Sequence, residues 1–108
     1  MRPESTCPVE AALAAVSGRW TSLVLRDLMH GPRSFGQLSL GLPELSDKVL
    51  ADRLSSLVDR GLVRRRVLAG FPSRTEYSLT DAGATLRPLL IELYRTGERL
   101  QELLGPEL

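Results

Sequence analysis

The sequence has few of the residue types that carry catalytic chemistry. Its 108 residues include one cysteine and one histidine, and only 5% are aromatic. One cysteine cannot form an intrachain disulfide, so a reducing compartment is expected. The histidine has no cysteine or histidine partner at metal-ligand spacing, and neither a glycine-rich phosphate loop nor a paired-acid arrangement is present. We therefore expect a protein that is not an enzyme and holds no metal and no cofactor.

Long hydrophobic runs are also absent. No apolar stretch approaches the roughly 18 residues that a membrane span needs. The first six residues include an acid and lack the apolar core of a signal peptide. The composition, 43% hydrophobic and 25% charged, is typical of a folded protein. We predict a single domain over residues 1–108, no membrane partner and a cytoplasmic location.

Charge is unevenly distributed, although the formal net charge is only +1. Residues 31–80 carry eight basic and five acidic groups, whereas residues 81–108 carry three basic and five acidic groups. No acid interrupts the basic run Arg60, Arg64, Arg65, Arg66 and Arg74. A local basic patch fits a polyanion bound by one face, and a solvated charged hairpin fits the same pattern.

Almost all of the positive charge is arginine. Lys48 is the single lysine among fourteen basic residues. Arginine favours bidentate contact with phosphate or guanine over diffuse attraction. A biased genomic base composition is an alternative cause of the same preference.

Apolar spacing and helix-terminating residues predict a mainly α-helical chain with one β-hairpin. Ser46 is a good N-cap for a helix whose Leu50, Leu54 and Leu57 share one face, opposite a polar face. Pro88 is expected to kink the last helix or to mark a packing joint. The expected elements are helices over residues 8–17, 20–29, 34–40, 46–60 and 81–104, and strands over residues 62–68 and 75–79.

This order predicts a winged helix-turn-helix, because a short helix, a Gly/Pro turn and an amphipathic helix precede a basic hairpin. Within the single domain, residues 1–30 would form core and dimerisation helices. Residues 31–80 would form the DNA-binding helix-turn-helix and wing, and residues 81–108 a C-terminal dimerisation helix. The rival functions are an enzyme, for which little chemistry is present, and a winged helix that contacts only proteins.

Ordered motifs point the same way. They are Cys7-Pro8-Val9-Glu10, Gly18-Arg19-Trp20-Thr21, Gly31-Pro32-Arg33-Ser34-Phe35, Leu50 to Leu54, Asp59-Arg60-Gly61-Leu62-Val63 and Pro72 to Gly83. Together they resemble HxlR-type regulators, a winged-helix group related to the MarR and ArsR families, over roughly residues 7–97.

The resemblance implies a DNA-binding repressor or activator that dimerises through its first and last helices. It also implies a response to electrophiles, aldehydes, oxidants or other small molecules. Asp47 and Asp52 depart from the family pattern, since related proteins commonly carry uncharged, amide or basic residues at these positions.

Candidate DNA contacts lie on the 46–60 helix and the hairpin. Ser46 and the free amides beside it can bind a phosphate, and Lys48 can reach a guanine or a phosphate. Asp47 and Asp52 either accept from a cytosine amine or pair with Lys48 or Arg53, and Arg53 is either a DNA contact or part of a structural ion pair. Arg74, near the hairpin bend, is expected to reach the minor groove. The full predicted DNA-binding set is Ser34, Ser46, Asp47, Lys48, Ala51, Asp52, Arg53, Arg65, Ser73 and Arg74.

The last helix has more leucines than one small core obviously needs, which predicts a homodimer, with packing on the first helices as the alternative. Two recognition helices about 34–36 Å apart would read a pseudo-palindromic operator in double-stranded DNA. The predicted dimer interface comprises Val9, Leu13, Leu90, Leu93, Tyr94 and Leu100.

Cys7 is the candidate redox sensor. It precedes Pro8 at a helix start, where the helix dipole favours the reactive thiolate. Oxidation would give an intersubunit disulfide or a mixed disulfide with a small thiol, in response to an oxidant or electrophile effector. The alternative is a small apolar side chain in the dimer seam.

Overall fold

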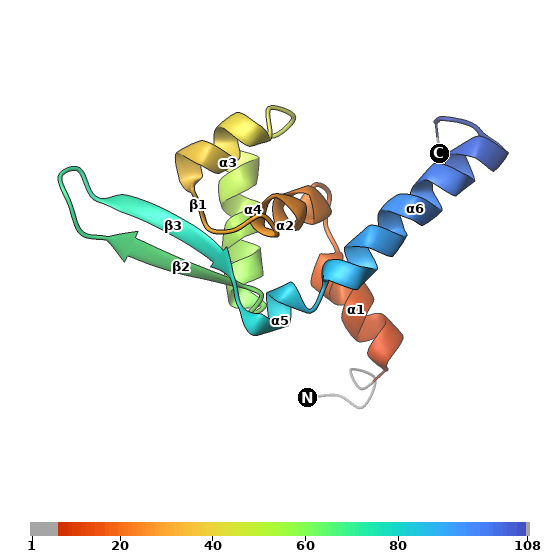
Figure 1. The fold of residues 1–108 in the computed structure, drawn as a ribbon, viewed down its shortest axis with the longest axis horizontal. Helices are drawn as coiled ribbons and strands as arrows, with labels where there is room; N and C mark the ends of the chain where they lie inside the picture. Colours follow the sequence, from red (N-terminus) through yellow and green to blue (C-terminus); the bar gives the residue numbers. More distant parts are fainter. Residues whose placement is uncertain (1–6, 108) are drawn as a thin grey trace.

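The computed structural model describes residues 7–107, so the expectation about a signal peptide in residues 1–6 lies outside it. The order of elements confirms a mainly helical winged helix-turn-helix (Figure 1). The elements are α1 (Pro8–Val16), α2 (Thr21–Leu28), β1 (Arg33–Ser34), α3 (Phe35–Gly41), α4 (Asp47–Asp59), β2 (Val63–Leu68), β3 (Arg74–Leu79), α5 (Asp81–Ala84) and α6 (Arg87–Leu104).

The core forms where α2 packs on α3 and α4. Val24 and Leu25 of α2 and Leu38 of α3 are completely buried. α4 contributes Leu50, Leu54 and Leu57, the apolar face that the sequence predicts. Trp20 and Phe35, half-buried, pack against this cluster. The core therefore holds the helix-turn-helix on α2, and the outer face of α4 is left to solvent.

The sheet is antiparallel, with strand order β1-β3-β2. β2 and β3 form the predicted hairpin, which extends away from the helices in Figure 1. The two-residue β1 was not predicted, because two residues are too few to show a strand period. Its Ser34 pairs with Glu76, so the start of α3 is fixed against the wing.

The C-terminal region differs from the single helix expected over residues 81–104. It consists of two helices, the short α5 and the long α6. Pro88 has no N–H and lies in the first turn of α6, where none is needed, so a new helix begins there. α6 then runs away from the body of the molecule (Figure 1).

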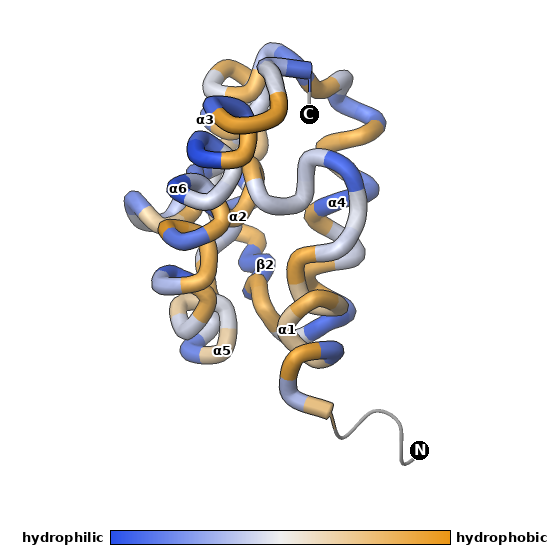
Figure 2. The backbone as a smooth tube through the Cα atoms, turned by 90° about the vertical axis from the view of Figure 1, so that its right-hand side faces the viewer, coloured by the Kyte–Doolittle hydropathy of each residue, from blue (hydrophilic) through white to orange (hydrophobic). Residues whose placement is uncertain are grey.

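Neither of the two terminal helices, α1 (Pro8–Val16) and α6 (Arg87–Leu104), contains a fully buried residue. Hydrophobic residues nevertheless recur along α1, as Figure 2 shows. Tyr94 and Leu103 of α6 are 67% and 62% exposed. Within residues 7–107, no helix combines the length and the hydrophobicity that crossing a membrane requires.

Candidate nucleic-acid interface

The two helices of the helix-turn-helix both begin at a serine cap. The Ser34 hydroxyl accepts from the Gln37 amide at 3.1 Å, and the Gln37 side chain accepts from the Ser34 amide at 2.8 Å, which completes a capping box. The Ser46 hydroxyl accepts from the Val49 amide at 3.1 Å, as its predicted capping role requires. Ser34 and Ser46, two of the three predicted contact serines, thus each orient a helix start, which is compatible with a phosphate at the free amides.

The outer face of α4 is polar and accessible. Lys48, Ala51 and Asp52 are all exposed, as the predicted contact face requires. The neighbouring Asp47 accepts a hydrogen bond from the Ser39 hydroxyl at 2.7 Å, which ties α4 to α3. The expected ion pairs of Asp47 and Asp52 with Lys48 or Arg53 are not formed within residues 7–107.

Arg53 has an intramolecular partner. Its Nε donates to the carbonyl oxygen of Arg19 at 2.6 Å, and the side chain is half-buried. This contact fits the structural interpretation that the sequence allowed for Arg53, although it is a hydrogen bond and not an ion pair. Arg53 holds α4 to the segment before α2.

The arginines of the wing lie on two faces. Side chains of directly paired residues in an antiparallel ladder share a face. Arg66 pairs with Glu76 and Leu68 pairs with Arg74, whereas Arg65 pairs with the buried Tyr77. Arg66 and Arg74 therefore share one face, and Arg65 lies on the other.

Two predicted contacts, Ser34 and Arg74, come together in a polar hollow of about 230 Å³ between the start of α3 and the wing. Gln37 and Glu76 also line this hollow. Glu76 forms a long ion pair with Arg66, with 3.7 Å between Oε1 of Glu76 and Nη2 of Arg66. Gln37 is not among the predicted DNA contacts. The Ser-x-x-Gln spacing that is typical of a capping box could have identified it from the sequence.

Arg60, which the sequence places in the basic run, is exposed but also bonds within the chain. Its Nη1 donates to the carbonyl oxygens of Ala14, Ala15 and Ser17, at 3.1, 2.9 and 3.1 Å. These carbonyls lie at the end of α1, where the regular helical hydrogen bonds stop, and that of Ala14 also accepts from the Ser17 hydroxyl at 3.0 Å. Arg60 therefore caps α1 from the end of α4.

The wing tip has an apolar residue that the predicted contacts omit. Phe71 is completely exposed, next to the exposed Ser73 and Arg74. The Phe-Pro dipeptide in a hairpin bend was its sequence signal. The tip thus offers an aromatic ring as well as a guanidinium group to a partner.

Cys7 is exposed and occupies the N-cap position of α1. The predicted interface residues Val9 and Leu13 follow on the same helix, 66% and 55% exposed. On α6, Leu93 and Leu100 are exposed, whereas Leu90 is half-buried against the core. Leu90, one of the predicted interface residues, thus packs within its own subunit.

Comparison with known proteins gives a consistent result. The family model described as HxlR-like helix-turn-helix matches residues 15–103. The uncharacterized HTH-type transcriptional regulator YvaP of Bacillus subtilis is 40% identical over 94 residues, 86% of this chain and 87% of YvaP. The HTH-type transcriptional regulator YodB of the same organism is 33% identical over 97 residues, 89% of this chain and 87% of YodB.

Solved structures agree with the fold. The redox regulator HypR in its reduced form superposes with a TM-score of 0.83 at 29% identity, covering 93% of this chain and 99% of HypR. The reduced form of YodB superposes with a TM-score of 0.76 at 31% identity, covering 94% of this chain and 97% of YodB.

Proposed function

Because the chain belongs to the HxlR-like helix-turn-helix family of transcriptional regulators, we propose that it reads a pseudo-palindromic DNA operator as a homodimer. Its relatives are regulators, so the chain is a regulator with a DNA partner and not an enzyme. A regulator that binds operator DNA must have access to the chromosome, which supports a cytoplasmic location. That location stays a prediction.

The observation that carries the proposal is the exposed polar face of α4 next to an arginine-bearing hairpin. Lys48 and Ala51 are accessible for base edges in the major groove, and the Ser46 end of α4 offers free amides to a phosphate. Arg74 and Ser73 are accessible at the wing for the adjacent backbone or minor groove. We assign Ser34 and Arg53 to positioning, because both already bond within the chain.

Arg74→Ala tests this interface. We expect operator affinity to fall about tenfold, because a lost phosphate or groove contact costs roughly 1–3 kcal/mol, with no change in melting temperature. The operator is first located by footprinting on the DNA upstream of the protein's own gene. Affinity is then measured by gel shift at several salt concentrations.

Arg99→Ala is the matched control, because Arg99 is an exposed arginine of α6 that pairs with Glu102, at 3.0 Å. Affinity that falls equally in both variants would mean a general charge effect. Binding that is normal in Arg74→Ala removes Arg74 from the interface. A parent protein without salt-dependent attraction to duplex DNA contradicts the proposed function as a whole.

Dimerisation is supported by the apolar residues that α1 and α6 leave exposed. Val9, Leu13, Leu93, Tyr94 and Leu100 all have 40% or more of their surface accessible. One monomer offers only a single recognition module, and a two-fold pair places two of them on successive turns of a duplex. We assign these five residues to the subunit interface.

Redox control through Cys7 is the finer part of the proposal. HypR is described as a redox regulator with reduced and oxidised forms, and YodB has been solved in reduced and diamide-treated forms. Cys7 is exposed at a helix start. Two Cys7 thiols, one from each subunit, would lose two electrons and two protons to an oxidant and form one disulfide.

Cys7→Ser separates this role from a packing role. The parent is expected to lose or gain at least about fivefold in operator affinity after diamide, because a disulfide across the dimer changes the separation of the recognition helices. The variant is expected to keep its affinity. Operator binding is compared by gel shift with and without diamide, followed by reduction. Equal behaviour of parent and variant under diamide would remove Cys7 from the sensing role.

A further inference from the structure

The bend of the wing carries an aromatic side chain that the rest of the chain leaves uncovered. Phe71 is fully exposed, in the middle of the five residues 69–73 that join β2 to β3. The last pair of the ladder before this bend is Leu68 with Arg74. At about 3.3 Å per residue, the paired strands hold the bend roughly 17 Å from the base of the hairpin. The ring is thus carried at the end of a projecting arm.

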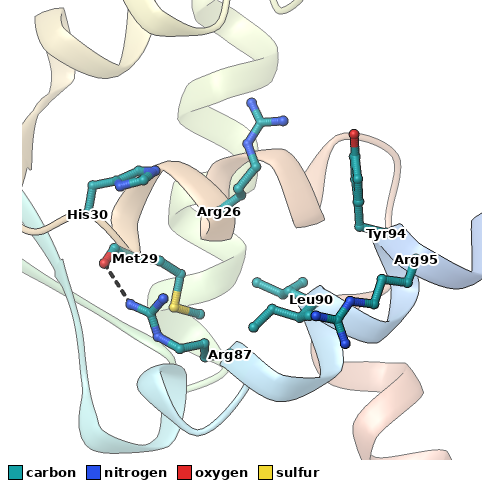
Figure 3. A pocket seen from close by; sticks show the side chains of 8 residues that line it. Arg26, Met29, His30, Arg87, Leu90, Tyr94 and Arg95 are labelled. Carbon is teal, nitrogen blue, oxygen red and sulfur yellow. Dashed lines mark hydrogen bonds between the residues drawn. The ribbon is translucent and has the colours of Figure 1, made fainter. Parts of the chain in front are cut away.

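Exposure alone does not mark a site, because single apolar side chains are common on protein surfaces. Most of the other exposed large hydrophobic residues lie on α1 and α6, the helices assigned to the subunit interface. Tyr94 of α6 is one of them, which Figure 3 shows near Leu90 and Arg95. The bend between β2 and β3 lies at the opposite end of the molecule from α6 (Figure 1). A dimer through α1 and α6 therefore does not account for Phe71.

The charged side chains near the bend are mostly basic. Arg74 follows the bend and shares one face of the hairpin with Arg66, whereas Arg65 lies on the other face. Glu76 is the single acid in residues 62–79, and it already forms an ion pair with Arg66. The ring is therefore presented by a positively charged hairpin, which fits a polyanion as its partner.

A protein partner fits this bend less well. A specific protein interface takes about 800 Å² from each partner, whereas one phenylalanine buries only about 150–250 Å². Duplex DNA offers flat apolar base faces behind rows of phosphates, so it can engage a ring and arginines together. The combination of one ring with several guanidinium groups therefore selects DNA.

We propose that Phe71 is a wedge that enters the minor groove and partly unstacks one base step at each outer flank of the operator. The wedge rests on the proposed function, which assigns Arg74, three residues further on, to the adjacent backbone or minor groove. The ring inserts between two base pairs while the guanidinium group of Arg74 contacts the phosphates. Apolar side chains that act in this way kink the duplex toward the major groove.

The wedge adds a form of sequence selection that needs no hydrogen bond to a base. Pyrimidine–purine steps are the steps that unstack most easily. We therefore expect a TA or CA/TG step under each wing bend, outside the bases that α4 contacts. Operator choice then depends on direct contacts at α4 and on the deformability of the DNA at the wing.

Operator duplexes that carry 2-aminopurine test the wedge with the full chain. This adenine analogue fluoresces more strongly when it is unstacked, and it is placed at successive positions across both flanks of the footprinted operator. We expect at least about a twofold rise at one step in each flank when the parent binds, and no rise with Phe71→Ala. Phe71→Leu keeps an apolar wedge and should retain most of the rise. Val67→Ala, the matched control, removes another exposed apolar side chain of the hairpin and should behave as the parent does.

Binding is measured separately, from the anisotropy of a fluorescein label on the same duplexes. A parent that binds the operator without a rise at any flank position overturns the wedge and leaves the proposed function intact. The same holds if Phe71→Ala gives the same rise as the parent. A parent that does not bind the duplex contradicts the proposed function and the wedge with it. The melting temperature of Phe71→Ala should equal that of the parent, because the ring is fully exposed.

Discussion

Gly83 is the residue whose size the packing constrains most directly. Thr80 joins the wing to the end of α4, since its hydroxyl donates to the Gly61 carbonyl at 2.7 Å and accepts from the Gly83 amide at 3.1 Å. The Thr80 amide also donates to the Leu62 carbonyl at 3.1 Å. A side-chain carbon at position 83 would overlap that carbonyl oxygen, which is backbone and cannot turn aside.

Gly83→Ala is therefore expected to destabilise the fold by about 1–3 kcal/mol, the usual cost of overpacking. The measurement is the free energy of unfolding from urea titration. Gly36→Ala is the matched control, because a methyl group there meets only the Ser34 hydroxyl at 4.0 Å. Gly36→Ala should cause no loss, and a Gly83→Ala protein as stable as the parent would contradict the close approach.

At the scale of elements, the recognition helix is tied to the N-terminal segment at two points. Arg53 donates to the Arg19 carbonyl, and Arg60 donates to the carbonyls that end α1. The positive guanidinium of Arg60 also lies at the negative end of the α1 dipole. Together with the packing of Ala15 and Val16 against the core, these bonds fix the position of α1 relative to α4.

Arg60→Met keeps most of the side chain's apolar stem and removes its donors. We expect a loss of about 1–2 kcal/mol, together with faster hydrogen exchange of the amides in α1. The comparison variant is Arg64→Met, which removes an exposed arginine from the neighbouring strand. If exchange in α1 rises equally in both variants, Arg60 does not anchor that helix.

At the scale of the whole molecule, the chain leaves two helices with apolar residues uncovered. It measures 52 × 37 × 22 Å, and α6 accounts for the projecting arm in Figure 1. An exposed apolar face of this kind marks an interaction surface, which we assign to a second copy.

Leu100→Glu is expected to weaken dimerisation at least a hundredfold, because each dimer would bury two unpaired carboxylates, at a cost of about 3 kcal/mol or more. Sedimentation equilibrium should show twice the mass of one chain for the parent and a monomer for the variant. Leu40→Glu places the same charge on a more exposed leucine of α3 and should stay dimeric. A monomeric parent, or a dimeric Leu100→Glu, contradicts this interface.

The sequence alone was sufficient for most of the helices, the hairpin and the winged order. Capping serines, the Leu50/Leu54/Leu57 spacing and the Gly/Pro turns act over a few residues, so they can be read locally. The exposed face of α4 followed from the same spacing. The family motifs added the regulator class, which the comparisons confirm.

Only the tertiary structure decided which arginines remain free for a partner. Arg53 bonds to a carbonyl 34 positions away and Arg60 to carbonyls up to 46 positions away, and no local pattern encodes such pairs. The two-residue β1 likewise depends on distant segments meeting, since it forms only by pairing with β3. Local physics therefore determined the elements of this protein, whereas long-range packing determined which of its charges are available.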